Sequence, residues 1–236
     1  MIISFKYKFI FVKTYKTAGS SIESYLYKFL DQNDIYAHTG DNIGINCWGE
    51  FDKENKLKEY YDETTYKDKV KKNLKFFAHM PIWLIEERLG PYSKKFNYDI
   101  FNNFFKFGVI RNPYDLVVSD YYWRNISNKN RKTSFEDILK EIKENTFASH
   151  GLLNLNKLMD KNLRNVLCDK IIKYENLNEE LSVIFKKLNI PFSGKLDIYK
   201  KKAIRDRDYK NFYNNESKKL IKKIFWKEFD YFDYLF

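Results

Sequence analysis

A short loop of small and hydroxyl-bearing residues, Lys16 to Ser21, constrains the fold of this chain more than any other part of its sequence. The residues before it, Phe5 to Val12, are aromatic and aliphatic and predict a buried strand. After the loop, apolar residues recur at helical spacing from Ile22 to Leu30, which predicts a helix that begins near Ser20 with Ser20 or Ser21 as its N-cap. The order strand, tight loop, helix is typical of the first unit of an α/β fold.

The same alternation of strands and helices continues along the chain. Further strands are expected at 34–38, 74–78, 104–110 and 168–174, and helices at 82–89, around 116–122, at 135–142, at 152–163 and up to 188. Gly90-Pro91 predicts the end of the helix at 82–89. The pattern predicts an α/β, P-loop-type three-layer fold with a central, mostly parallel sheet of about five strands flanked by helices. The length of 236 residues suits a single domain, 1–236.

The charge of the chain favours an anionic partner. Its 43 Lys and Arg against 32 Asp and Glu give a net charge of +11. Nucleic acid, acidic lipid and a polyphosphorylated cofactor all suit this charge. The segment 195–236 is a basic, helical C-terminal region, which indicates either a solvated face or a lid that closes over an anion.

Cysteine content and hydropathy bear on the compartment. Cys47 and Cys168 have no spacing typical of a metal site or a disulfide framework. The apolar stretches are shorter than a membrane span needs, and Met1 to Val12 carries Lys6 and Lys8 without a cleavage site, so it predicts a strand rather than a signal peptide. We expect a cytoplasmic protein without an integral membrane segment.

The loop has the parts of an anion-binding cradle. The N-terminus of a helix presents unpaired N–H groups and a partial positive charge. Gly19 permits close approach of the backbone, Thr17, Ser20 and Ser21 add hydroxyl groups, and Lys16 adds a positive charge. The order differs from the Walker pattern, because the lysine opens the loop instead of closing it. A P-loop kinase or NTPase is therefore disfavoured but stays an alternative, as does a helix cap beside a solvated lysine.

A second candidate anion site follows the strand at 104–110. Arg111 lies at its carboxyl end, in the run Arg111-Asn112-Pro113-Tyr114-Asp115, and Ser119 comes two helical turns later. In open α/β sheets, ligands bind at this edge. The planar guanidinium of Arg111 matches phosphate geometry, and Ser119 is within reach of the same oxygens.

Together, the segments 11–21 and 109–119 resemble the two signatures by which carbohydrate-type (family 2-like) sulfotransferases bind 3′-phosphoadenosine 5′-phosphosulfate (PAPS). The resemblance implies that the first segment binds the 5′-phosphosulfate and that Arg111 and Ser119 bind the 3′-phosphate. Residues 171–177 and 209–236 are also similar to the family, whereas 40–73 does not match it and is expected to be a variable insertion or acceptor-side region. Tyr15 departs from the family, which often has Pro there. The implied cofactor-binding residues are Lys16, Thr17, Ala18, Gly19, Ser20, Ser21, Arg111 and Ser119.

The resemblance implies sulfuryl transfer to a hydroxyl group of a carbohydrate or another acceptor, with adenosine 3′,5′-bisphosphate (PAP) as product. Lys16 suits stabilisation of the charge that develops on the bridging oxygen. His79, expected at the same sheet edge, is the candidate base, with His38 second and His150 structural. Both Lys16 and His79 are thus predicted catalytic residues, and no metal site is expected. Lys200, Lys201, Lys202, Arg205 and Arg207 are candidates for closing over the nucleotide.

Two other functional classes stay open beside the NTPase. A basic nucleic-acid-binding module without catalysis would bind oligonucleotides in a strongly salt-dependent way, although we expect no nucleic-acid partner. An inactive sulfotransferase-like fold would bind the nucleotide and transfer nothing. The sequence names neither the acceptor nor the oligomeric state.

Overall fold

The computed structural model describes residues 1–37, 44–45, 75–127, 132–144, 151–196 and 208–236. Among these residues, six strands form one mixed sheet in the order β4-β3-β1-β2-β5-β6. Strands β2, β5 and β6 are parallel, whereas β1, β3 and β4 join through antiparallel pairings. The parallel part therefore forms one half of the sheet. The strands are β1 (Ile2–Ser4), β2 (Phe9–Val12), β3 (Ile35–Ala37), β4 (Gly44–Ile45), β5 (Phe105–Ile110) and β6 (Lys170–Lys173).

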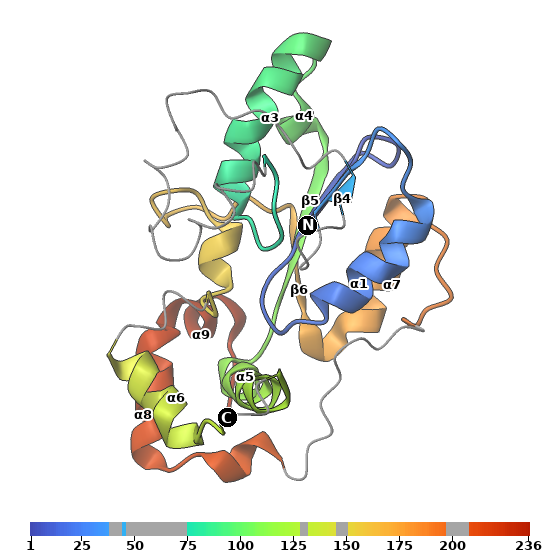
Figure 1. The fold of residues 1–236 in the computed structure, drawn as a ribbon. Helices are drawn as coiled ribbons and strands as arrows, with labels where there is room; N and C mark the ends of the chain where they lie inside the picture. The colour runs from blue at the N-terminus through green and yellow to red at the C-terminus, as the bar shows by residue number, and fades with distance from the viewer. Residues whose placement is uncertain (38–43, 46–74, 128–131, 145–150, 197–207) are drawn as a thin grey trace.

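Helices cover both faces of this sheet (Figure 1). Helices α1 (Gly19–Leu26) and α7 (Leu177–Lys187) lie on one face, and α3 (Ile82–Phe96) lies on the other. Successive residues of β2 point to opposite faces, as expected for a strand. Phe9 and Phe11 pack in the cluster with α1 and α7, whereas Ile10 and Val12 pack in the cluster with α3. The predicted α/β fold with helices flanking a central sheet is confirmed.

A third apolar cluster lies at one end of the sheet, where four helices gather (Figure 1). Two side chains tie the last residues of the chain to the ends of the parallel strands: Asn112 Nδ2 donates to the Leu235 carbonyl and Lys173 Nζ to that of Phe232, both at 2.8 Å. The helices are α5 (Pro113–Ser127), α6 (Phe135–Lys143), α8 (Asn215–Ile224) and α9 (Trp226–Phe232). The short elements are α4 (Ile100–Asn103) and the 3₁₀ turns η1 (Tyr27–Phe29), η4 (Leu155–Leu158), η5 (Tyr174–Asn176) and η6 (Tyr209–Phe212).

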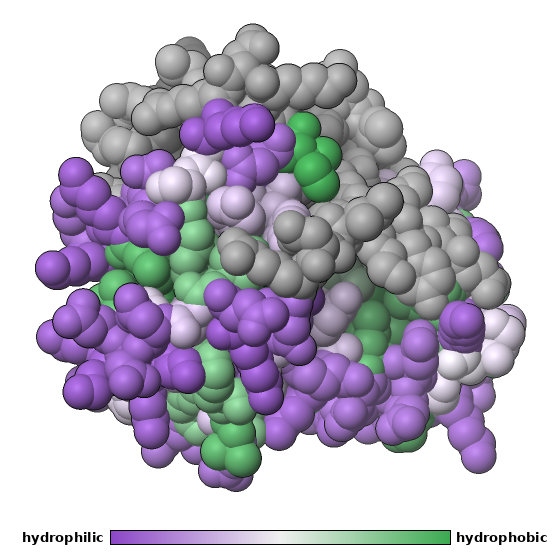
Figure 2. All heavy atoms as spheres, turned by 90° about the horizontal axis from the view of Figure 1, so that it is seen from below, coloured by the Kyte–Doolittle hydropathy of each residue, from purple (hydrophilic) through white to green (hydrophobic). Residues whose placement is uncertain are grey.

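Within the basic C-terminal segment, helix α8 has one buried and one solvated face. Helix α8 buries Ser217 and Ile221 against the third cluster, while Lys219, Lys222 and Lys223 are exposed. Seen from this end of the molecule, the described surface is mostly hydrophilic, with smaller apolar areas between (Figure 2). For α8, the pattern of exposure fits a solvated face.

The structure corrects the sequence predictions in several places. Of the predicted strand from Phe5 to Val12, only Phe9–Val12 is a strand, and residues 5–8 form the turn that joins it to β1. Asp34 accepts hydrogen bonds from Ser4 Oγ and the Phe5 N–H where this turn begins. The predicted strand at 74–78 is buried coil where it is described, so its apolar residues reflect burial rather than sheet pairing.

Two helix predictions were also wrong. Helix α3 continues through Pro91 to Phe96, because the proline is on the exposed side, while Ile82, Ile85 and Leu89 hold the helix against the sheet. The segment 152–163 forms only the turn η4, followed by a bridge between Met159 and Val166. In both cases tertiary packing prevails over local propensity.

Candidate functional site

The loop between β2 and α1 has an unusual backbone. Lys16 and Ala18 both adopt left-handed conformations, with φ of 58° and 61°. Ala18 is the N-cap of α1 and no side chain caps the helix, so neither Ser20 nor Ser21 does so, contrary to the prediction. Such conformations are costly for residues other than glycine and concentrate at functional sites. A Cβ on Gly19 would lie 2.8 Å from Lys13 Cγ, so glycine is required where the helix begins.

Buried polar groups hold the loop from beneath. Thr14 Oγ1 donates to the carbonyl of Val109 in β5 and lies 2.7 Å from Thr17 Oγ1. The Lys13 ammonium lies 2.5 Å from a carboxylate oxygen of Glu23, and both side chains are buried. The Thr17 hydroxyl thus belongs to the support of the loop. Toward a ligand, this part of the loop offers backbone N–H groups.

Arg111 joins the two predicted anion-binding segments. Its guanidinium lies 2.6 Å from the Asp115 carboxylate, and its Nη1 donates to the Lys16 carbonyl at 3.0 Å. The guanidinium carbon is 4.1 Å from the centre of the Tyr174 ring. Strands β2 and β5 are parallel neighbours, which brings the loops that follow them to the same edge. Segments 95 residues apart in the sequence therefore lie side by side at this edge.

One face of α5 continues this site. Asp115, Ser119 and Trp123 follow each other at intervals of four residues, so they lie on the same side of the helix. Ser119 is partly exposed. The Lys16 ammonium lies 5.0 Å from the centre of the Trp123 ring, which is 41% exposed. The lysine side chain thus reaches across from the loop to α5.

His79 is near the loop, although it does not follow a strand as predicted. It lies within a turn rather than after a strand, with φ of 61°. Its Nδ1 is 3.2 Å from the Lys13 carbonyl oxygen, and its ring stacks on that of Tyr15 at 3.9 Å. Burial lowers the pKa of His79 well below its ordinary 6.5, and the charges of Lys13 and Lys157 lower it further. The imidazole is therefore neutral at physiological pH.

Sequence reasoning missed three residues that support the site. Asn154 bonds both backbone groups of Tyr15, and Lys157 Nζ lies 3.4 Å from the His79 carbonyl oxygen. Glu175 accepts from the Asn112 N–H at 2.8 Å and holds the turn after β5. Only Glu175, within the segment similar to the family, carried a sequence signal.

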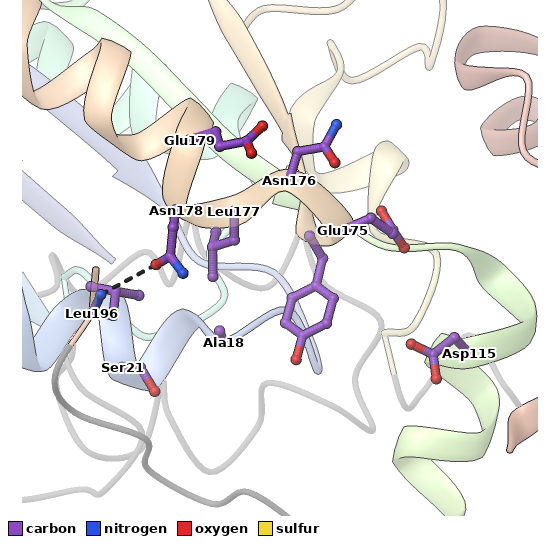
Figure 3. A pocket seen from close by; sticks show the side chains of 10 residues that line it. Ala18, Ser21, Asp115, Glu175, Asn176, Leu177, Asn178, Glu179 and Leu196 are labelled. Atoms are coloured by element: carbon purple, nitrogen blue, oxygen red, sulfur yellow. Dashed lines mark hydrogen bonds between the residues drawn. The ribbon is translucent and has the colours of Figure 1, made fainter. Parts of the chain in front are cut away.

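A pocket of about 370 Å³ opens beside the loop (Figure 3). Ala18 and Ser21 border it on one side, and η5 and the start of α7 border it on the other. Two of its carboxylates are already engaged: Asp115 by Arg111, and Glu175 by Asn112 and Tyr234. Its lining residues are Ala18, Ser21, Asp115, Tyr174, Glu175, Asn176, Leu177, Asn178, Glu179 and Leu196.

Several predicted residues lie outside the described part of the chain: His38, His150 and most of 40–73, together with Lys200, Lys201, Lys202, Arg205 and Arg207. Within the described part, no group of three His, Cys, Asp or Glu side chains could hold a metal ion. No described helix is both long and apolar enough to cross a membrane.

No family model matches the chain. An uncharacterized protein of Archaeoglobus fulgidus is 35% identical over 114 residues, which are 48% of this chain and 84% of that protein. The two proteins belong to one family. The crystal structure of a sulfotransferase from Alicyclobacillus acidocaldarius is similar over 93% of this chain and 92% of its own, with a TM-score of 0.45 and 15% identity. That likeness is too distant to carry an argument about function.

Proposed function

We propose that this chain is a sulfotransferase that transfers the sulfuryl group of PAPS to a hydroxyl group of an acceptor. The acceptor that we propose is a carbohydrate. The observation that carries it is the hydrogen bond from Arg111 Nη1 to the Lys16 carbonyl. This bond joins the two segments that resemble PAPS signatures at one edge of the parallel strands.

The residues present suit a bisphosphorylated nucleotide. The first N–H groups of α1 and the Lys16 ammonium would hold the 5′-phosphosulfate, since a helix N-terminus favours anions. Arg111 and Ser119 would hold the 3′-phosphate, and the pocket beside Ala18 and Ser21 would take the nucleoside. Bound there, PAPS would supply the sulfuryl group.

The chain's own groups would then serve the transfer. Lys16 would stabilise negative charge on the oxygen that leaves sulfur. His79 Nδ1 faces a carbonyl oxygen, which only accepts, so Nδ1 carries the proton and Nε2 has the lone pair of a base. The neutral state of the buried imidazole supports this role.

Calorimetry with PAP tests the cofactor assignment. We expect the wild type to bind PAP, and Arg111→Lys and Ser119→Ala to bind it about ten- to a hundredfold more weakly, since each loses a hydrogen bond to a charged phosphate. Arg124→Lys is the matched control, because Arg124 also pairs with an aspartate four residues away on α5. It should bind PAP like the wild type.

Absence of PAP binding by the wild type would contradict the proposal, as would an unchanged affinity in Arg111→Lys. Hydrolysis of ATP that depends on Mg²⁺ would favour the P-loop NTPase instead. Salt-dependent oligonucleotide binding without preference for PAP would favour the nucleic-acid-binding module.

A transfer assay with PAPS and a panel of carbohydrate, phenolic and small alcohol acceptors tests the reaction and its acceptor class. We expect His79→Ala to lose roughly 10²–10⁴-fold in kcat, the usual contribution of a general base, with PAP affinity nearly unchanged. A fully active variant would exclude His79 as the base.

A further inference from the structure

The Tyr15 ring is fixed on several sides. It stacks face to face on the His79 imidazole, with the two ring planes 9° from parallel and the ring centres 3.9 Å apart. The Lys157 ammonium lies 5.2 Å from the centre of the same tyrosine ring. A Cβ on Gly151 would come within 2.6 Å of Tyr15 Cε2, so the backbone of Gly151 packs directly against the ring. The position of the imidazole is therefore linked to that of Tyr15.

The backbone of Tyr15 is fixed as well. The Asn154 side chain accepts from the Tyr15 N–H at 2.8 Å and donates to the Tyr15 carbonyl at 2.9 Å. Asn154 is only 1% exposed, so water does not compete for these bonds. The hydrogen bonds of Asn154 thus fix the backbone of Tyr15, whose ring stacks on His79.

The imidazole has one nitrogen bound and one open. Nδ1 donates to the Lys13 carbonyl, the residue two positions before Tyr15. Across the described ranges, no residue forms a hydrogen bond with His79 Nε2. The segment 13–15 therefore contacts the imidazole both at Nδ1 and over its flat face.

We propose that Tyr15 is a positioning residue: its ring holds the His79 imidazole where Nδ1 keeps its bond to Lys13 and Nε2 stays open to receive a proton. The proposal rests on the proposed function. In the transfer, the acceptor O–H proton passes to Nε2 while the acceptor oxygen bonds to sulfur. The sulfur–oxygen bond of the donor breaks, and its electron pair stays on the phosphate oxygen of PAP.

Four charged groups act on the imidazole. Lys13, Lys157 and the Met1 ammonium disfavour its protonation, whereas Glu23 favours it; burial acts in the same direction as the three cations. Removal of the Lys157 charge should therefore raise the pKa of His79. Lys157→Met should shift the acid limb of the pH profile of kcat/KM to higher pH. The neutral imidazole should keep its proton on Nδ1.

The test compares Tyr15→Leu with Tyr15→Phe. Leucine fills the space but cannot stack, so we expect kcat to fall about tenfold or more through misorientation of the base, with KM and PAP affinity nearly unchanged. Phenylalanine keeps the ring, so kcat should stay within about twofold of the wild type. Tyr25→Leu is the matched control, because Tyr25 stacks on Phe185 in another cluster; it should keep the wild-type pH profile. Tyr15→Met replaces Tyr15→Leu if that variant does not fold.

Nitrogen-15 NMR of the histidine rings, with His79 assigned through His79→Gln, reports on position without turnover. We expect the Nδ1–H form in the wild type and in Tyr15→Phe, and a mixture of both tautomers in Tyr15→Leu. An unchanged tautomer and kcat in Tyr15→Leu would overturn the proposal, as would an equal loss in Tyr15→Phe. The NMR measurement needs no PAPS. Failure of the proposed function would therefore appear as absence of PAP binding or sulfuryl transfer, whereas failure of this inference would appear as an unchanged tautomer in Tyr15→Leu.

Discussion

At the scale of single residues, Lys16 has the most demanding position. Its backbone is left-handed, its carbonyl accepts from Arg111, and its ammonium lies over Trp123. A lysine in this conformation persists only where its surroundings determine it. One residue thus links the loop to both the end of β5 and the exposed face of α5.

Lys16→Met should lower the rate of sulfuryl transfer roughly 10²–10³-fold, the cost of losing one group that stabilises transition-state charge. Affinity for PAP should fall less, since the N–H groups of the loop remain. Steady-state kinetics and calorimetry measure the two effects. Lys28→Met is the control, because Lys28 also lies over an aromatic ring, Tyr25, but on the exposed turn η1. Equal losses in both variants would count against a role for Lys16.

At the scale of elements, the segment around η4 supports the loop instead of forming a helix. Asn154 binds Tyr15, and Leu158 packs so closely on β5 that a Cβ on Gly108 would lie 2.5 Å from its Cδ2. The side chains that precede and form η4 thereby connect the loop to the sheet.

Asn154→Ala should destabilise the protein by on the order of 2–4 kcal/mol, because two buried backbone groups of Tyr15 lose their partners. Urea unfolding measures this change. Asn165→Ala removes an exposed side-chain bond to Asp160 and should cost about 0.5 kcal/mol or less. A stability of Asn154→Ala within that range would mean that water replaces the bonds.

At the scale of the whole molecule, the C-terminal helix α9 contacts the segment that supports the loop. Glu228 of α9 accepts a hydrogen bond from the Leu155 N–H at 3.3 Å and is 4% exposed. Burial raises the pKa of Glu228 to about 7, from an ordinary value of 4.5. One buried carboxyl group thus connects the third apolar cluster with the segment that holds the loop.

This shift makes stability depend on pH. A carboxyl group with a raised pKa holds its proton more firmly in the folded state, so its contribution falls as the pH rises from 4.5 to about 7. Above that range, ionised Glu228 should cost on the order of 3 kcal/mol. Glu228→Gln should therefore match the wild type near pH 4.5 and exceed its unfolding free energy near pH 8. The difference in unfolding free energy between the two proteins cancels the contributions of other titrating groups. A difference that stays constant across this pH range would show that Glu228 keeps an ordinary pKa.

Local patterns in the sequence were enough to predict the elements that carry the two candidate anion-binding segments. The helix after Lys16 and the strand that ends at Arg111 were predicted with starts within one residue of those of α1 and β5, whereas for β2 only the end at Val12 was predicted correctly. Periodicity and helix signals act within a few residues, so they are legible in a single sequence. The parallel arrangement of the two strands followed from their alternation with helices.

Only the tertiary structure decided how the rest of the site is built. Asn154 meets Tyr15 across 139 positions of sequence, and His79 meets Lys13 across 66, although neither lies on a strand. Such contacts leave no periodic trace, because they depend on how separate elements pack. The sequence by itself predicted the strand, loop and helix around Lys16 and the strand that ends at Arg111. Packing of distant segments decided that a buried, neutral histidine stacks on the tyrosine of that loop.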